Sequence, residues 1–124
     1  MANKKEFSDE EVFEGKVYEE DDISEIDREI IAGEWENLTN NETYRKRSRS
    51  GRIIAMHQAI SNRIKQLEKL FYQLVRDHPE KSEKMLARIK RLRFLQQYLL
   101  QAYAWEEQGE LYSHPIPEEL EGLI

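Results

Sequence analysis

Apolar residues recur at three- and four-residue steps along most of the chain, a pattern typical of amphipathic helices. The longest such stretch runs from about Arg52 to Asp77, and the next runs from Pro79 to about Glu107. The first stripe consists of Ile53, His57, Ile60, Ile64, Leu67, Phe71 and Leu74, widened by Leu70 and Val75. The second stripe consists of Met85, Leu86, Ile89, Leu92, Leu95, Leu99 and Ala102. Since no segment alternates with a period of two, we expect an all-α protein.

The dipeptide His78-Pro79 separates the two long stretches. Proline disfavours helical geometry in the residue before it, yet fits the first position of a new helix, and Ser82 is a further possible cap. Gly109 is a plausible stop for the second stretch. Two long helices joined by such a short turn fold back on each other, so we predict an antiparallel hairpin.

A shorter helix is predicted to begin near Ser24 and to end at Asn40-Asn41. Ser24 followed by Asp27 resembles a capping box. Its apolar face consists of Ile23, Ile26, Ile30, Ile31, Trp35 and Leu38, and this face should cover one side of the hairpin. The basic segment from Tyr44 to Gly51 is interpreted as a loop or as the fraying start of the next helix.

These elements divide the chain into three parts. Residues 1–21 form an acidic arm with few apolar residues, and residues 109–124 form an acidic C-terminal tail. Residues 22–108 form the helical domain between them. Both ends are expected to be flexible, because neither carries enough apolar surface to build a core.

Charge follows a related division. Residues 1–43 hold 4 Lys/Arg and 15 Asp/Glu, a net charge of −11. Residues 44–105 hold 15 Lys/Arg and 4 Asp/Glu, a net charge of +11, and residues 106–124 carry −6. A basic centre between acidic ends indicates a surface for polyanions, an internal charge clamp, or both.

Several classes of function are disfavoured by what the chain lacks. It has no cysteine, so disulfides, thiolate metal sites and cysteine nucleophiles are excluded. The first residues have no apolar stretch of a secretory signal, and no run approaches the ~18 apolar residues of a membrane span. We therefore expect a cytoplasmic protein that does not act at a membrane.

Catalytic and metal-binding patterns are also missing. His57, His78 and His114 are scattered without metal-ligand spacing, and the acidic runs lack the arrangement of a calcium loop. Unburied carboxylate runs also cannot separate their pKa values for acid–base work. We expect no enzymatic activity, no cofactor, no metal and no small-molecule substrate.

The strongest candidate site is the basic set of the middle block. Phosphate groups are bound by many donors along a ridge, and each contact adds to affinity through counterion release. The candidate phosphate-binding residues are Arg45, Lys46, Arg47, Arg49, Arg52, Arg88, Arg91 and Arg93. Tyr44, Phe94 and Tyr98 offer rings on which exposed bases stack.

Residues 51–99 also carry a skeleton of spaced residues. It consists of Ser61, Arg63-Ile64, Leu67, Phe71, Arg76-Asp77-His78, Leu86, Ile89, Arg93, Leu95 and Tyr98-Leu99. This skeleton resembles the S-fifteen family of small-subunit ribosomal proteins, which form a helical hairpin. The resemblance implies RNA contacts at Asp77, His78, Arg93 and Tyr98. The chain departs from the family pattern at Pro79 and Glu80 in the turn.

The sequence therefore predicts a non-enzymatic RNA- or nucleic-acid-associated helical protein. The alternative is a regulatory adaptor that binds a protein partner or forms a homodimer, with Phe94, Tyr98, Tyr103 and Trp105 as anchors and the acidic arms as charge mimic or autoinhibitor. Aromatic residues mixed with arginines would favour nucleic acid, whereas a separate apolar patch would favour a protein interface. A third interpretation is that the acidic segments neutralise the basic hairpin internally.

Overall fold

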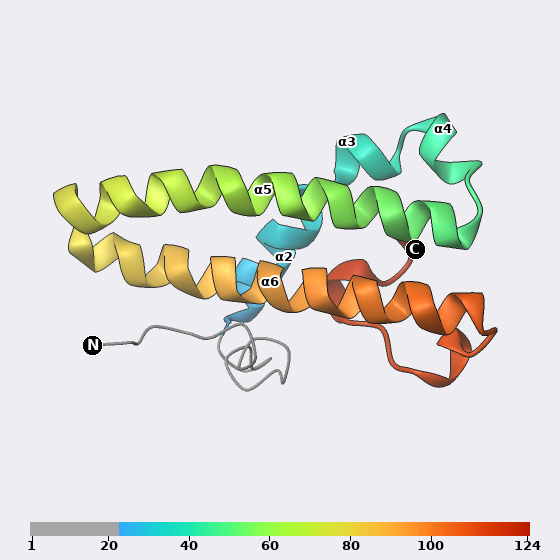
Figure 1. The fold of residues 1–124 in the computed structure, drawn as a ribbon. Helices are drawn as coiled ribbons and strands as arrows, with labels where there is room; N and C mark the ends of the chain where they lie inside the picture. Colours follow the sequence, from blue (N-terminus) through green and yellow to red (C-terminus); the bar gives the residue numbers. More distant parts are fainter. Residues whose placement is uncertain (1–22) are drawn as a thin grey trace.

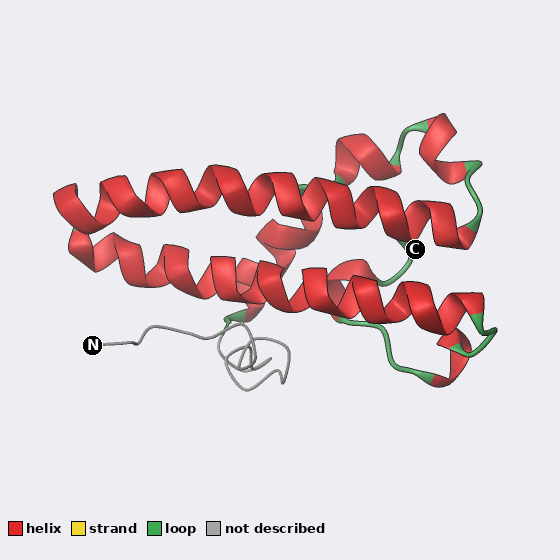
Figure 2. Cartoon of the chain, viewed as in Figure 1, coloured by secondary structure: helices red, strands yellow, loops and turns green. Residues whose placement is uncertain are grey.

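A computed structural model describes residues 23–124, so the predicted arm at residues 1–21 lies outside the described residues. Two long helices dominate the fold, α5 (Arg49–Asp77) and α6 (Pro79–Glu107), and they lie antiparallel along their whole length (Figure 1). Figure 2 shows helices and loops throughout residues 23–124, with no strand among them. The predicted all-α hairpin is confirmed. Within residues 23–124, no helix has both the length and the apolar composition that crossing a bilayer requires.

The start of α5 differs from the prediction by one helical turn. Ser48 caps the helix, because its side chain accepts a hydrogen bond from the Gly51 backbone N–H at 3.1 Å. The preceding segment forms the short helix α4 (Glu42–Arg45), capped by Asn41. The basic segment predicted as a loop or fraying helix is therefore largely helical, because two side-chain caps fix its two helix starts.

The turn between the long helices follows the prediction closely. His78 has non-helical backbone angles (φ −145°, ψ 72°), and Pro79 is the first residue of α6. Ser82 lies within the first turn of α6 and donates its hydroxyl hydrogen bond to the Pro79 carbonyl at 2.6 Å, so it does not cap the helix. After α6, Gly109 adopts φ +73°, a left-handed conformation that favours glycine and ends the helix.

The hairpin core consists of the predicted stripes with small changes at their edges. Its fully or nearly fully buried residues are Ile53, Met56, Ile60, Ile64 and Leu67 on α5, and Ile89, Leu92, Leu95, Leu99 and Ala102 on α6. Met56 is completely buried although it lies outside the predicted stripe. Leu70 and Val75, which were predicted to widen that stripe, are exposed. Near the turn no third element among residues 23–124 covers the hairpin, so apolar residues there face solvent.

The predicted N-terminal helix is divided into α2 (Glu25–Gly33) and α3 (Glu36–Thr39). Ser24 caps α2 as predicted, accepting from the Asp27 N–H at 3.3 Å. The division at Gly33 lets α2 cross one face of the hairpin while α3 runs beside α5 (Figure 1). Buried positions on this segment recur every four residues, at Ile23, Asp27, Ile31 and Trp35.

The apolar face of α2 also differs from the prediction. Ile26 and Ile30 are exposed by 67% and 42%, although both were assigned to the packed stripe. The buried position between them in sequence is Asp27, a carboxylate. The helix is rotated so that Asp27 faces the hairpin, because an arginine of α6 pairs with it there.

The C-terminal tail packs against the domain, which differs from the predicted flexible end. It forms two short 3-10 helices, η2 (Leu111–Ser113) and η3 (Glu118–Leu120), which contact α6 and α2 respectively. Leu111 and Leu120 are fully buried. A few apolar residues suffice because the tail also contributes a buried ion pair, so it is part of the folded domain.

Candidate functional site

Asp27 of α2 pairs with Arg88 of α6. Arg88 donates to Asp27 Oδ1 through Nε at 2.9 Å and through Nη2 at 2.7 Å. Burial alone would raise the pKa of the Asp27 carboxyl, but the hydrogen bonds from Arg88 and Ser24 outweigh it and hold that pKa below its ordinary value. The ion pair thus joins the acidic N-terminal helix to the basic hairpin.

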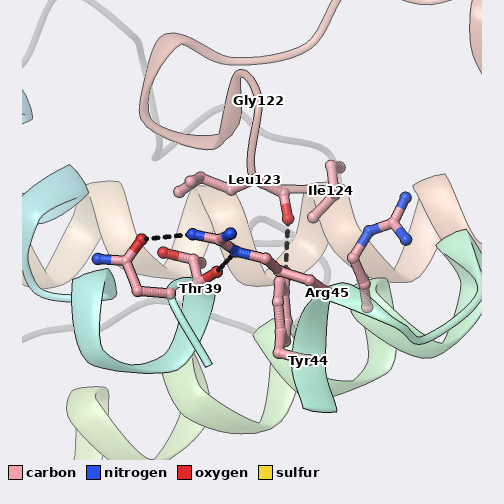
Figure 3. Close-up of a pocket in the computed structure, with 8 residues that line it drawn as sticks. Thr39, Tyr44, Arg45, Gly122, Leu123 and Ile124 are labelled. Carbon is pink, nitrogen blue, oxygen red and sulfur yellow. Dashed lines mark hydrogen bonds between the residues drawn. The ribbon is translucent and has the colours of Figure 1, made fainter. Parts of the chain in front are cut away.

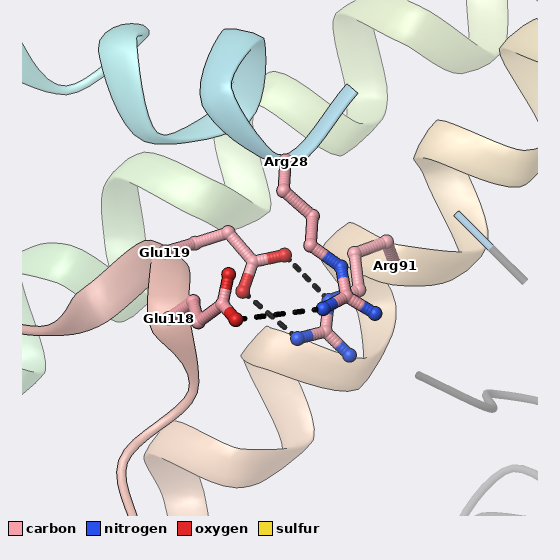
Figure 4. A network of polar contacts seen from close by, with 4 residues as sticks. All are labelled: Arg28, Arg91, Glu118 and Glu119. Carbon is pink, nitrogen blue, oxygen red and sulfur yellow. Dashed lines mark hydrogen bonds and ion pairs between the residues drawn. The ribbon is translucent and has the colours of Figure 1, made fainter. Parts of the chain in front are cut away.

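Arg91 of α6 forms a two-pronged ion pair with Glu119 of η3 (Figure 4). The Arg91 Nε–Glu119 Oε2 distance is 2.6 Å and the Arg91 Nη2–Glu119 Oε1 distance is 2.8 Å. The two side chains are exposed by only 1% and 0%. Beside them Arg28 Nη1 lies 3.9 Å from Glu118 Oε1. The tail is therefore held by charge as well as by apolar contact.

Two further ion pairs lie along the hairpin. Arg63 of α5 donates to Glu34, just after α2, and Arg93 of α6 donates to Glu68 of α5. Arg88, Arg91 and Arg93 were all predicted to bind phosphate. The structure places each of them against a carboxylate of this chain, and Arg91 is buried. The third interpretation, an internal charge clamp, accounts for the middle of the hairpin.

The other five predicted phosphate-binding residues gather at the open end of the hairpin. They are Arg45, Lys46, Arg47, Arg49 and Arg52, and together with Tyr44 we call them the open-end cluster. Lys46 lies 3.2 Å from Glu42, an exposed pair one helical turn apart. Within residues 23–124, the other four cationic side chains have no carboxylate within ion-pair distance. Their charge is available to a ligand.

Backbone contacts hold two of these arginines in place. Arg45 donates to the Thr39 carbonyl and to Asn40 Oδ1, each at 3.2 Å, and Arg52 donates to the Arg47 carbonyl at 2.6 Å. Burial raises the pKa of the Tyr44 hydroxyl, against the charges of Arg52 and Arg47. The charges of Arg47 and Arg52 thus lie near the Tyr44 hydroxyl, and hydrogen bonds hold Arg45 and Arg52 against the chain.

A pocket of about 350 Å³ lies within this cluster, between α3, α4 and the C-terminal residues. Figure 3 shows Arg45 beneath Leu123, with the Tyr44 hydroxyl directed at the Leu123 carbonyl. That hydroxyl donates a hydrogen bond of 2.6 Å. The tail therefore forms one wall of a concave, arginine-lined site, which we call the arginine pocket.

The Asp77–His78 turn lies at the opposite end of the hairpin from the open-end cluster (Figure 1). Both residues are exposed, and their neighbours are local: Arg76 lies 3.8 Å from Asp77 and Glu80 lies 3.7 Å from His78. The structure therefore does not bring Asp77 and His78, two of the residues implied by the ribosomal resemblance, together with the basic cluster.

The predicted aromatic residues divide between two environments. The rings of Tyr98 and Trp105 meet edge-on, with their centroids 6.0 Å apart. The Trp105 ring also stacks on the His114 ring, with a centroid distance of 3.6 Å. Burial raises the pKa of Tyr98, with the charge of Arg49 opposing it, so this cluster adjoins the basic end. Phe94 lies 4.6 Å beneath the Arg91 guanidinium. Phe94, Tyr98 and Trp105 are thus partly buried, and the first two lie near arginines.

Tyr103, the fourth aromatic anchor, is exposed and lines an apolar groove of about 240 Å³. The groove lies between the two long helices and is lined by Ile53, Ile54, His57, Leu99, Leu100 and Tyr103. Partial burial lowers the pKa of His57, which keeps its imidazole neutral more readily. His57 therefore lies at the edge of the core, on the apolar stripe where the sequence placed it.

Sequence reasoning missed a second pocket, of about 460 Å³, between α3 and α5. It is lined by Glu34, Trp35, Asn37, Leu38, Ala59, Asn62, Arg63 and Gln66, and we call it the amide pocket. Trp35 is almost completely buried, and its indole N–H has no acceptor within residues 23–124. The signal in the sequence was the spacing of Asn62 and Gln66, four residues apart and hence on one helix face.

Within residues 23–124, no group of three or more histidine or acidic side chains is placed to hold a metal ion. No family model, curated protein or solved structure matches this chain.

Proposed function

We propose that this chain is a non-enzymatic nucleic-acid-binding protein, with RNA as the expected ligand, and that it contacts phosphate through the open-end cluster. The observation that carries this proposal is the distribution of ion pairs. Carboxylates of the chain neutralise Arg63, Arg88, Arg91 and Arg93 along the hairpin. Four of the five basic residues at its open end have no such partner among residues 23–124, and the fifth has only an exposed one. A ligand with several phosphates is the natural counterion for such a cluster.

The position of the cluster adds a second argument. Arg49 and Arg52 lie in the first turn of α5, which contains no acidic residue. A helix N-terminus carries partial positive charge, so cations there cost about 0.3–1 kcal/mol each instead of stabilising the helix. The cluster therefore lowers local stability while raising the potential that attracts an anion, which favours a binding role.

Titration of a labelled single-stranded RNA at several salt concentrations tests the proposal. We expect micromolar or tighter binding at low salt, with a salt slope of about 0.7 for each phosphate that the protein neutralises. A triple variant should reduce the magnitude of this salt slope by roughly 2, because it removes three charges. Its substitutions are Arg45→Gln, Lys46→Gln and Arg47→Gln. The matched control is Lys65→Gln, Lys69→Gln, Lys81→Gln, three exposed lysines elsewhere on the hairpin. Equal weakening by both triple variants, or no binding at low salt, would contradict the proposal.

The second candidate function is a protein interface at the apolar groove. Ile54, Leu100 and Tyr103 are exposed by 54%, 51% and 38% and meet there without covering groups among residues 23–124. A second copy of the chain is the simplest occupant, because an antiparallel hairpin can pair its exposed faces about a two-fold axis. Sedimentation over a wide concentration range, with Leu100→Glu as the disrupting variant, tests it. A monomer at all concentrations would exclude self-association through this groove.

A further inference from the structure

The amide pocket lies next to the arginine pocket, and α3 contributes to both. Asn37 and Leu38 line the amide pocket, whereas Thr39 lines the arginine pocket. On α5, Arg52 lines the arginine pocket and Ala59 lines the amide pocket. Seven helical residues span about 10 Å, which is about three nucleotides of a stacked strand. A strand bound at one pocket therefore reaches the other.

The amide pocket offers hydrogen-bond donors from two side chains of α5, Asn62 and Gln66. Asn62 Oδ1 accepts from Gln58 at 3.1 Å, and Gln66 Oε1 accepts from Arg63 at 3.0 Å. Their amide nitrogens have no acceptor among residues 23–124. Each carbonyl is thus occupied by a neighbour on the same helix, so the N–H groups remain for a ligand.

Trp35 supplies an independent observation at the same pocket. It is exposed by 5%, and its indole N–H is one of the few buried polar groups without a partner in the described part of the chain. Trp35 lines the pocket beside the apolar side chains of Leu38 and Ala59, and together they form an apolar wall on which a flat ring can pack.

We propose that the amide pocket holds one unpaired nucleobase of a single strand whose phosphates contact the open-end cluster. This inference rests on the proposed function and specifies its ligand. Bases present carbonyl oxygens and ring nitrogens that accept from amide N–H groups, and the Glu34 carboxylate can accept from a base amino group. A base enters such a pocket only when it is unpaired, so single strands are preferred over duplexes.

Three ligands of equal length test the proposal: a single-stranded RNA octamer, the same sequence as a duplex, and an octamer of the same backbone without bases. We expect the single strand to bind at least tenfold more tightly than the duplex or the base-free octamer. The double variant Asn62→Ala, Gln66→Ala should weaken binding of the intact single strand about tenfold and leave the base-free octamer unchanged. The matched control is Gln73→Ala, Gln101→Ala, two exposed glutamines outside both pockets.

Tryptophan emission gives a second readout at the pocket itself. The chain has two tryptophans, so a Trp105→Phe variant leaves Trp35 as the reporter. Its emission should change with the intact single strand and not with the base-free octamer. The inference is overturned if duplex and single strand bind equally. It is also overturned if the Asn62→Ala, Gln66→Ala variant binds each of the three ligands within twofold of the wild-type affinity. Failure of the proposed function is distinguishable, because then none of the three ligands binds at low salt.

Discussion

The middle of the hairpin and its open end both carry basic residues, but these residues are paired with carboxylates in the middle and largely unpaired at the open end. In the middle, Arg88 and Arg91 face carboxylates that come from segments far away in the chain, at Asp27 and Glu119. At the open end, Arg45, Arg47 and their neighbours have no such partners among residues 23–124. The difference teaches that a high density of basic residues does not equal available charge. Neutralised arginines hold the fold together, whereas unpaired ones remain for a ligand.

The largest expected effect is at the buried ion pair. Glu119→Ala leaves the Arg91 guanidinium buried without its main counter-charge, which should lower the free energy of unfolding by about 3–5 kcal/mol. Denaturant unfolding measures the loss. Replacing both partners, with Arg91→Met and Glu119→Leu, should restore most of it, because a buried pair exchanged for apolar groups is close to neutral.

The neighbouring carboxylate provides a control for that experiment. Glu118 is 65% exposed and lies 3.9 Å from Arg28, so Glu118→Ala should cost less than about 1 kcal/mol. If Glu118→Ala and Glu119→Ala lower the free energy of unfolding equally, the buried ion pair stabilises the middle of the hairpin no more than an exposed pair would.

The next effect is at Asp27. Asp27→Asn removes the charge that accepts two hydrogen bonds from Arg88, and should cost about 1–3 kcal/mol at pH 7. Because the folded-state pKa of Asp27 lies below its unfolded value, its contribution is complete above the ordinary aspartate pKa of about 3.9 and is lost as the pH falls through the folded-state pKa.

Unfolding measured from pH 7 down to pH 2 checks the dependence on Asp27. The wild-type chain and Asp27→Asn should converge in stability at the acid end. Glu29→Gln makes the same chemical change at an exposed position of α2 and should run parallel to the wild type. A difference between wild type and Asp27→Asn that stays constant with pH would rule out a titrating contribution.

A smaller effect is expected where the tail meets α4. Tyr44→Phe removes the 2.6 Å hydrogen bond to the Leu123 carbonyl while keeping the buried ring, at a cost of about 1 kcal/mol. Thermal or denaturant unfolding measures this change. Tyr112, which is 84% exposed, gives the control Tyr112→Phe, for which no change is expected.

The smallest effect has the opposite sign. Arg49→Gln removes a cation from the first turn of α5 and a guanidinium whose buried Nε has no acceptor within residues 23–124. It should raise the free energy of unfolding by about 0.5 kcal/mol and weaken RNA binding. Arg76→Gln makes the same change in the last turn of the same helix, where a cation is favourable, and should lower stability slightly. If Arg49→Gln instead lowers the free energy of unfolding, the open-end arginines stabilise the fold as those in the middle of the hairpin do, and the contrast between these two regions is wrong.

Much of the site could be predicted from residue types, although its geometry could not. The five basic residues between Arg45 and Arg52 were identified from the charge of the middle block, and they do gather at one end of the hairpin. Arg88, Arg91 and Arg93 belonged to the same prediction because sequence does not show which carboxylate will face them. The amide pocket went unnoticed because it joins α3 to the middle of α5, and that contact depends on the break at Gly33.

Apolar spacing, one proline and a few capping residues were enough to define the two long helices and their antiparallel pairing, because these features act within a few residues of one another. The rotation of α2, the docking of the tail and the pairing of Asp27 and Glu119 with arginines of α6 required the folded chain. The Asp27–Arg88 pair joins residues 61 positions apart, and the Arg91–Glu119 pair joins residues 28 positions apart. Such contacts depend on the balance between desolvation and charge attraction, which exists only in the folded state.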